Sequence, residues 1–262
     1  MGQAGSAYWF QFPQWVRGPA KIVGNEIVLD EGRAEEYYIH EPTDLLPDLA
    51  GLAEFLDSRS KGERLAVAFA RRHGLLWHGP DKVGTGECRE QLREWLHAAI
   101  NIRVTALLYV RLVDSIESGS VRPLRDLQKE LEWDWTTAFK DKPTTDLEYL
   151  SYASVVVAQM VNEGLDGCSH MIAAACAIMD PEGQGAPLGE PGVFLLDVRP
   201  RTLEAAAYVH FSQQIEHQTP LSECPGCGRP FLPKSRKQRY CSESCASTAR
   251  WRRWKGKKAK TA

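Results

Sequence analysis

The chain has 262 residues, 43% hydrophobic and 25% charged, a composition typical of a globular protein with a sizeable core. Its net charge of −2 conceals a split. The residues from Ser222 to the end carry 12 Lys and Arg against two acids, whereas those before carry 20 basic and 32 acidic residues, so the tail favours an anionic partner. No apolar run approaches the roughly 18 residues of a membrane span, and no signal-peptide pattern opens the chain, so we expect a cytoplasmic protein without membrane association.

A β-hairpin is the first element that the sequence predicts, within about residues 20–40. Ala20–Asp30 places two β-rich runs around Gly24-Asn25, a pair that tolerates a positive φ. Ala34–His40 is a candidate for a further strand. An aromatic cluster precedes the hairpin, and we expect core packing for it rather than ligand stacking, because large aromatic rings usually supply buried area. Its members are Tyr8, Trp9, Phe10, Phe12 and Trp15.

Helices are predicted to form most of the remaining body. Their ranges are Leu46–Leu56, Glu63–His73, Glu87–Ser118, Val121–Leu131, Asp146–Asn162 and Thr202–His217. In the longest helix, apolar residues recur near helical spacing at Leu92, Leu96, Ile100, Val104, Leu107 and Val110. In the fifth, the core candidates are Leu147, Leu150, Val155, Val156 and Met160. Val193–Val198 is predicted to be a strand, and Asp180–Pro191 an exposed loop. The expected fold class is α+β, with a mainly helical body over residues 1–220.

Four of the seven cysteines lie close together near the C-terminus. Their spacing is Cys224-x2-Cys227-x13-Cys241-x3-Cys245, whereas Cys88, Cys168 and Cys176 lie elsewhere. In a reducing compartment two close pairs indicate a metal site before disulfides. Zn²⁺ prefers four such ligands in a tetrahedron, so we expect one structural zinc ion; an iron–sulfur cluster is the alternative for the same ligands.

The order of elements around these cysteines predicts a treble-clef finger over residues 221–262. The glycines of Cys224-Pro-Gly-Cys-Gly permit the tight turn of a zinc knuckle. A short hairpin is expected within Pro230–Tyr240. The second cysteine pair then opens a basic helix, with Ser242 as the predicted N-cap.

Basic residues surround the finger, and we expect them to contact nucleic acid through its phosphates. The candidates are Arg236, Lys237, Arg239, Arg250, Arg252, Arg253 and Lys257. Trp251 and Trp254 are candidates for stacking on bases, and the alternative for both is packing over the metal site. For the basic charge as a whole, the alternatives are contact with the acidic body or with another protein, and solubility alone.

The finger resembles a known family on particular residues. Cys224-Pro-Gly-Cys-Gly-Arg-Pro-Phe-Leu-Pro, Lys237-Gln-Arg-Tyr-Cys-Ser-Glu-Ser-Cys and Arg250-Trp-Arg-Arg-Trp are similar to the C-terminal finger of the CGNR zinc-finger proteins, poorly characterised bacterial proteins predicted to regulate transcription. Phe69-Ala-Arg-Arg-His-Gly-Leu-Leu and Leu203–His217 are similar, more loosely, to helices that precede such fingers. The Gly-Asn-Arg element of the family is missing here, because Cys245 is followed by Ala246-Ser247-Thr248.

The sequence contains no nucleotide-binding, metalloprotease or serine-hydrolase motif. His170 lies beside Cys168, but neighbours in sequence are rarely oriented as a thiol–base pair. We therefore expect a non-enzymatic, DNA-binding transcription regulator whose acidic helical body senses a small-molecule effector or mediates assembly. The alternatives are a protein-interaction or autoinhibitory zinc module docked on the acidic body, and an RNA-binding or toxin-like component. The oligomeric state is not predicted.

Overall fold

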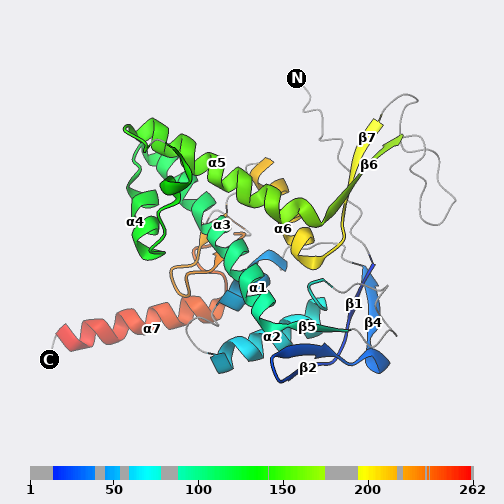
Figure 1. Cartoon of the computed structure of the whole chain (residues 1–262). Coiled ribbons are helices and arrows are strands. Elements are labelled where there is room, and N and C mark those ends of the chain that lie inside the picture. Colours follow the sequence, from blue (N-terminus) through cyan, green and yellow to red (C-terminus); the bar gives the residue numbers. More distant parts are fainter. Residues whose placement is uncertain are drawn as a thin grey trace.

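The computed structural model describes residues 14–38, 45–53, 59–77, 88–140, 142–174, 194–216, 221–233, 235 and 237–260. The N-terminal strands lie at one end of a helical body, a two-stranded ribbon from the later part of the chain lies apart from them, and a long C-terminal helix extends away from the body (Figure 1). The predicted α+β composition, a mainly helical body with a small N-terminal β element, is confirmed within these residues.

The N-terminal strands form two small antiparallel sheets. β1 (Gln14–Arg17) pairs with β4 (Glu35–Tyr38), and β2 (Ala20–Val23) pairs with β3 (Glu26–Leu29). A two-residue turn joins β2 to β3, with Gly24 at a φ of 65°, which confirms the predicted hairpin. A third strand of that sheet, β5 (Arg89–Gln91), was not predicted; it pairs with β3 and falls inside the range expected for the long helix.

The body contains six α-helices among the described residues. They are α1 (Leu45–Gly51), α2 (Arg59–His73), α3 (Leu92–Ser118), α4 (Arg122–Glu130), α5 (Asp146–Gly164) and α6 (Leu203–Glu216). Short 3-10 turns cover Glu31–Arg33, Trp135–Ala138 and Leu165–Gly167. All six predicted helices are present, although α1 and α3 are shorter than expected over the described residues.

Local chemistry explains where two of these helices begin and end. α3 ends where Gly119 adopts a φ of 65° and its N–H bonds to the Ile116 carbonyl, an arrangement that favours glycine. α5 begins with a capping box, in which the Thr145 hydroxyl accepts from the Glu148 N–H and the Glu148 carboxylate accepts from the Thr145 N–H.

The predicted apolar faces need correction in both long helices. In α3 only Leu92, Leu107 and Val110 of the predicted stripe are buried, because that helix is surrounded on several sides. Its fully buried residues include Trp95, Ala99, Ile102 and Ala106. In α5, Val156 is buried, and Leu150 and Met160 pack against the core. Leu147 and Val155, however, are 74% and 51% exposed, because one face of α5 lies away from the core.

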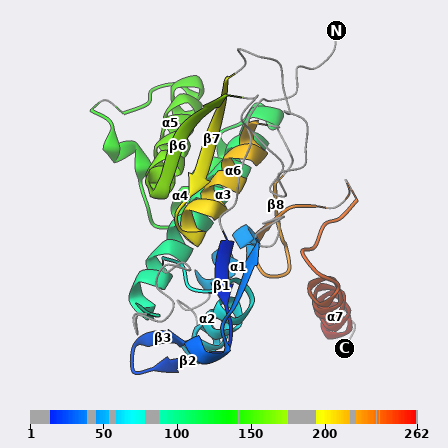
Figure 2. The same cartoon turned by 90° about the vertical axis from the view of Figure 1, so that its right-hand side faces the viewer.

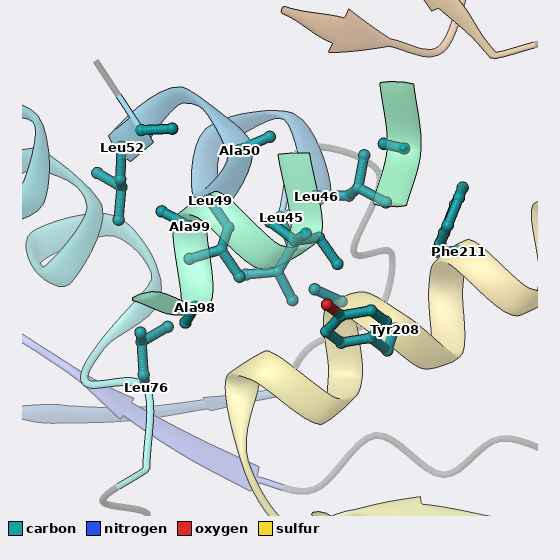
Figure 3. Packing of buried hydrophobic residues seen from close by; sticks show 14 of the residues in the cluster. Leu45, Leu46, Leu49, Ala50, Leu52, Leu76, Ala98, Ala99, Tyr208 and Phe211 are labelled. Carbon is teal, nitrogen blue, oxygen red and sulfur yellow. The ribbon is translucent and has the colours of Figure 1, made fainter. Parts of the chain in front are cut away.

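α1 packs between α3 and α6. Figure 3 shows the leucines of α1 between Ala98 and Ala99 of α3 and the rings of Tyr208 and Phe211 of α6. The small alanines allow the helices to approach closely, so that Leu45, Leu46 and Leu49 are almost fully buried. This layer fixes α3, which also carries the C-terminal finger.

Two further predictions concern aromatic packing and the strand after α5. Trp15 is 2% exposed and donates from Nε1 to the Leu75 carbonyl at 2.9 Å, as expected of a core residue. Tyr8, Trp9, Phe10 and Phe12 lie outside the described residues. The predicted strand is present as β7 (Phe194–Pro200), and its partner β6 (Cys168–Ala174) was not predicted. The predicted loop over 180–191 lies outside the described residues.

One helix, α3, is long and apolar enough to cross a membrane by length and composition. Half of its most apolar stretch is buried inside the body, where it contacts α1, α4, α5 and α6. Its apolar character is thus explained by its place at the centre of the described helices.

His210 makes the stability of the fold sensitive to mild acid. The residue is 5% exposed, its Nδ1 has no partner among the described residues, and burial lowers the pKa of the imidazole. Below about pH 6.5 the unfolded chain therefore takes up a proton that the folded chain does not, so stability decreases as the pH is lowered. We expect His210→Leu to remove up to about 1.4 kcal/mol of this loss per pH unit. Urea unfolding between pH 7 and 5.5 measures it, and equal losses in both proteins would contradict the prediction.

Candidate metal centre

The four predicted cysteine ligands come together in space. The Sγ atoms of Cys224, Cys227, Cys241 and Cys245 all lie within 4.8 Å of one another. The Cys227–Cys241 and Cys241–Cys245 sulfur pairs are 3.6 and 3.5 Å apart. Four sulfurs around one Zn²⁺, with bonds of about 2.3 Å, would lie about 3.8 Å apart. The cluster is therefore compact enough to hold a single metal ion.

A tight turn presents the first two cysteines. β8 (Ser222–Glu223) and β9 (Pro230–Phe231) pair on either side of it, and the Cys224 carbonyl accepts from the Cys227 and Gly228 N–H groups. Gly228 has a φ of 67°, and a Cβ on Gly226 would lie 3.1 Å from the Cys245 Cβ. The predicted role of the glycines is thus seen in both a positive φ and a close approach. The predicted hairpin within 230–240 is wrong for the described residues. The only strand described there is β9, and its partner is β8, which precedes it in the chain.

The second cysteine pair lies at the start of α7 (Glu243–Lys260). The Ser242 hydroxyl accepts from the Cys245 N–H at 3.2 Å, which confirms the predicted N-cap. The cap fixes the first turn of the helix, and this turn places the Cys245 sulfur against Cys241. The metal cluster and the orientation of α7 are therefore set by the same few residues.

The backbone around the cluster favours thiolate at one position. Burial raises the pKa of the Cys224 thiol, but hydrogen bonds from the backbone N–H groups of Cys241, Gly226 and Cys227 lower it by more. Together they bring the pKa to about 7. Burial raises the pKa of Cys227, and raises that of Cys241 to about 11. A bound cation would compensate the burial of these charges, because metal ligation deprotonates a thiol. The donor set and its N–H···S bonds thus fit a thiolate-bound metal.

The finger rests on the helical body through its strands. Phe231 and Leu221 are buried, and the strands contact α1 and α3. An ion pair joins Arg111 of α3 to Glu223 of β8. The Arg229 side chain lies against Gly51 of α1, where a Cβ would be 3.1 Å from Nη1. These contacts hold the strands beside the cysteine cluster against α1 and α3 of the body.

α7, in contrast, extends away from the body. Figures 1 and 2 show it standing clear of the other helices, with only its first turn near the finger. Arg250, Arg252, Trp251 and Trp254 are exposed, the two indoles to 56% and 54%. Among the side chains that the structure describes, no ion pair joins α7 to a carboxylate of the body. The exposed indoles do not match the alternative in which they cover the metal site.

The remaining candidates are placed to different degrees. Lys237 and Arg239 are exposed on the loop before Cys241. Arg236 lies outside the described residues. Arg253 and Lys257 belong to α7, but the structure does not describe their side chains. The basic candidates that are described therefore gather on the finger loop and on α7.

The residues that attach the finger to the body were missed at the sequence level. They are Arg111, Glu223 and Arg229, and Arg103 lies beside Gly228 of the knuckle. No local pattern signals them, because Arg111 and Glu223 are 112 positions apart in the chain.

No second cysteine site is found among the described residues. Cys88 is buried in the core, and burial raises the pKa of the half-buried Cys168 thiol to about 11. Such a thiol is a poor nucleophile at neutral pH. The chain matches no protein-family model, and it shows no significant similarity to any curated protein. The site is thus a cluster of four cysteines that could hold one metal ion, with a long helix that begins at its second cysteine pair.

Proposed function

We propose that the four cysteines hold one structural Zn²⁺ in a finger related to the treble clef. A set of four sulfurs suits zinc, and no described nitrogen or oxygen ligand completes the cluster. The knuckle between β8 and β9 and the capped helix after it support the treble-clef assignment. Because all four positions around the metal would be filled by sulfur, its role is to fix the fold of the segment rather than to catalyse.

We propose further that the protein binds nucleic acid, DNA in the first place, through α7 and the loop before it. The observation that carries the proposal is the exposed, cationic helix that projects from the metal centre. Arginines bind phosphates through paired hydrogen bonds, and exposed indoles can stack on bases. The acidic body attracts no described α7 side chain into an ion pair, which favours nucleic acid over docking of this helix on the body.

The regulatory part of the proposal rests on the resemblance to the CGNR fingers and on the size of the body. A helical body far larger than its finger has room for a sensor or an assembly surface. The Gly-Asn-Arg element of that family is missing after Cys245. We therefore assign phosphate contacts to the basic residues of the finger and assign no base-specific contact to them.

The proposal predicts a change in salt dependence when two exposed arginines are removed together. The double variant Arg250→Gln/Arg252→Gln should lose two phosphate contacts. Its affinity for duplex DNA should therefore depend less steeply on salt, with the negative slope of log affinity against log salt reduced in magnitude by about 2. Arg93→Gln/Lys129→Gln removes two exposed cations of the body and should leave the slope unchanged. Equal slopes in wild type and the α7 variant would contradict the assignment. Tighter binding to RNA of the same length would keep the surface and change the partner.

A further inference from the structure

A cavity of about 470 Å³ lies in the body, on the side of α3 that faces the finger knuckle. Its base is formed by the buried Ala53 and Leu107, and half-buried apolar side chains form its walls. The wall residues are Ile100, Val104, Leu131 and Met160. This volume lies within the range of small-molecule sites, about 300–1,000 Å³.

A few polar groups converge on these apolar walls. Arg103 is half-buried, and Asn101 and Glu130 stand exposed at the rim. No carboxylate lies within ion-pair distance of Arg103 in the described part of the chain. Glu223 forms its ion pair with Arg111, and Arg103 affects the Glu223 carboxyl only through its charge, which lowers the pKa of that group. Arg103 therefore presents a cation that no carboxylate of the described residues neutralises by direct contact.

The backbone at the end of α4 places an aromatic ring at the same rim. Glu132 has a φ of 49°, the left-handed conformation that follows a helix end and usually requires glycine. The next residue, Trp133, lines the cavity and packs edge-on against the buried Trp135, with ring centroids 5.8 Å apart. A strained residue that directs an indole to a cavity is a feature typical of binding sites.

We propose that this cavity binds a small amino acid-like molecule with a large apolar or aromatic side chain. Its carboxylate would pair with Arg103, its amino group would donate to Glu130 and Asn101, and its side chain would lie between Trp133 and the apolar walls. Opposite charges at one rim select a ligand that carries both, whereas a simple anion would be repelled by Glu130.

The site also lies next to the finger. Arg103 Nη2 is 3.5 Å from the place that a Cβ on Gly228 would occupy, so the guanidinium lies between the cavity and the knuckle. A ligand that pairs with Arg103 would therefore contact a residue that lies beside the knuckle. The site itself does not depend on nucleic-acid binding, and its test needs none.

Calorimetric titration of the metal-loaded full chain tests the proposal with three matched probes. L-Tryptophan carries both charged groups, indole-3-propionate lacks the amine, and tryptamine lacks the carboxylate. We expect saturable binding of tryptophan, weaker binding of indole-3-propionate, and the weakest binding of tryptamine. L-Phenylalanine and L-leucine then report whether the side chain must be aromatic.

Two variants locate the site. Arg103→Gln should weaken tryptophan binding at least about tenfold, because it removes a charge-assisted contact. Val104→Phe fills the cavity and should abolish binding, which covers the case in which Arg103→Gln disturbs the knuckle. Arg93→Gln, an exposed arginine of the same helix, should bind as wild type does. The proposal is overturned if no amino acid binds at millimolar concentration, if tryptamine binds as tightly as tryptophan, or if both cavity variants bind normally.

Discussion

Replacing Cys224 by serine is expected to remove the bound metal and to release α7 from its fixed orientation. Cys224 is the most buried of the four ligands, and its sulfur accepts from the Cys241 N–H at 3.4 Å, so it joins the two halves of the centre. Structural zinc contributes an apparent binding free energy of about 10–16 kcal/mol in isolated finger peptides, and this drives their folding. Zinc content should fall from one equivalent to near zero, and limited proteolysis should cut between residues 232 and 260.

Cys168→Ala is the matched control for this prediction. This cysteine is half-buried but lies far along the chain from the cluster. The variant should therefore keep its full zinc content and the protease resistance of its tail. Retention of one zinc equivalent by Cys224→Ser, with an unchanged digestion pattern, would show that the ligand assignment is wrong.

Glu90→Ala is expected to destabilise the body by at least about 3 kcal/mol. The side chain is 3% exposed and accepts from the Leu76 N–H at 2.8 Å, the Trp77 N–H at 2.6 Å and Trp95 Nε1 at 2.6 Å. Truncation would leave three donors without an acceptor, two of them buried and one half-buried, and a buried donor left unpaired costs about 1–3 kcal/mol. Urea unfolding with a fixed metal concentration measures the loss.

The neighbouring exposed residue Glu94 supplies the comparison. It lies in the first turn of α3, where an acidic side chain contributes only about 0.3–1 kcal/mol through the helix dipole. Glu94→Ala should thus lower stability by about 1 kcal/mol or less. Losses of similar size in the two variants would refute the view that Glu90 anchors the loop after α2 to α3.

The metal centre could be predicted because its determinants are local. All four ligands lie within 22 residues, and their spacing limits how they can meet. The cap at Ser242 likewise depends on a residue three positions ahead, Cys245. Such short-range chemistry can be read from a sequence without knowledge of the fold.

The attachment of the finger to the body could not be predicted, because it depends on distant residues. Arg111 and Glu223 meet only after α3 has packed beside β8. Strand β5 is not predicted because its three residues are too few to show an alternating pattern, and they form a strand only by pairing with β3. The exposure of Leu147 and Val155 likewise follows from which neighbours α5 has, and the apolar pattern alone does not reveal this.

The predicted finger topology shows how far local reasoning reaches. The knuckle glycines have the predicted role, but strand β9 pairs with β8, which precedes it, and not with a strand that follows it. Two-residue strands carry almost no pattern of their own, so their pairing is fixed by the turn between them. That turn is held by the Cys224 carbonyl, which accepts from both Cys227 and Gly228.

Fluorescence anisotropy of the metal-loaded full chain with a labelled random DNA duplex, across a salt series, tests the central claim most directly. Phosphate contacts from α7 and its loop predict binding at about 50 mM salt that weakens linearly on a log–log scale as salt rises. The Cys224→Ser chain, in which α7 has lost its anchor, should bind more weakly at every salt concentration. Absence of binding by the wild-type protein at low salt would contradict the nucleic-acid function and direct attention to a protein partner for the exposed helix.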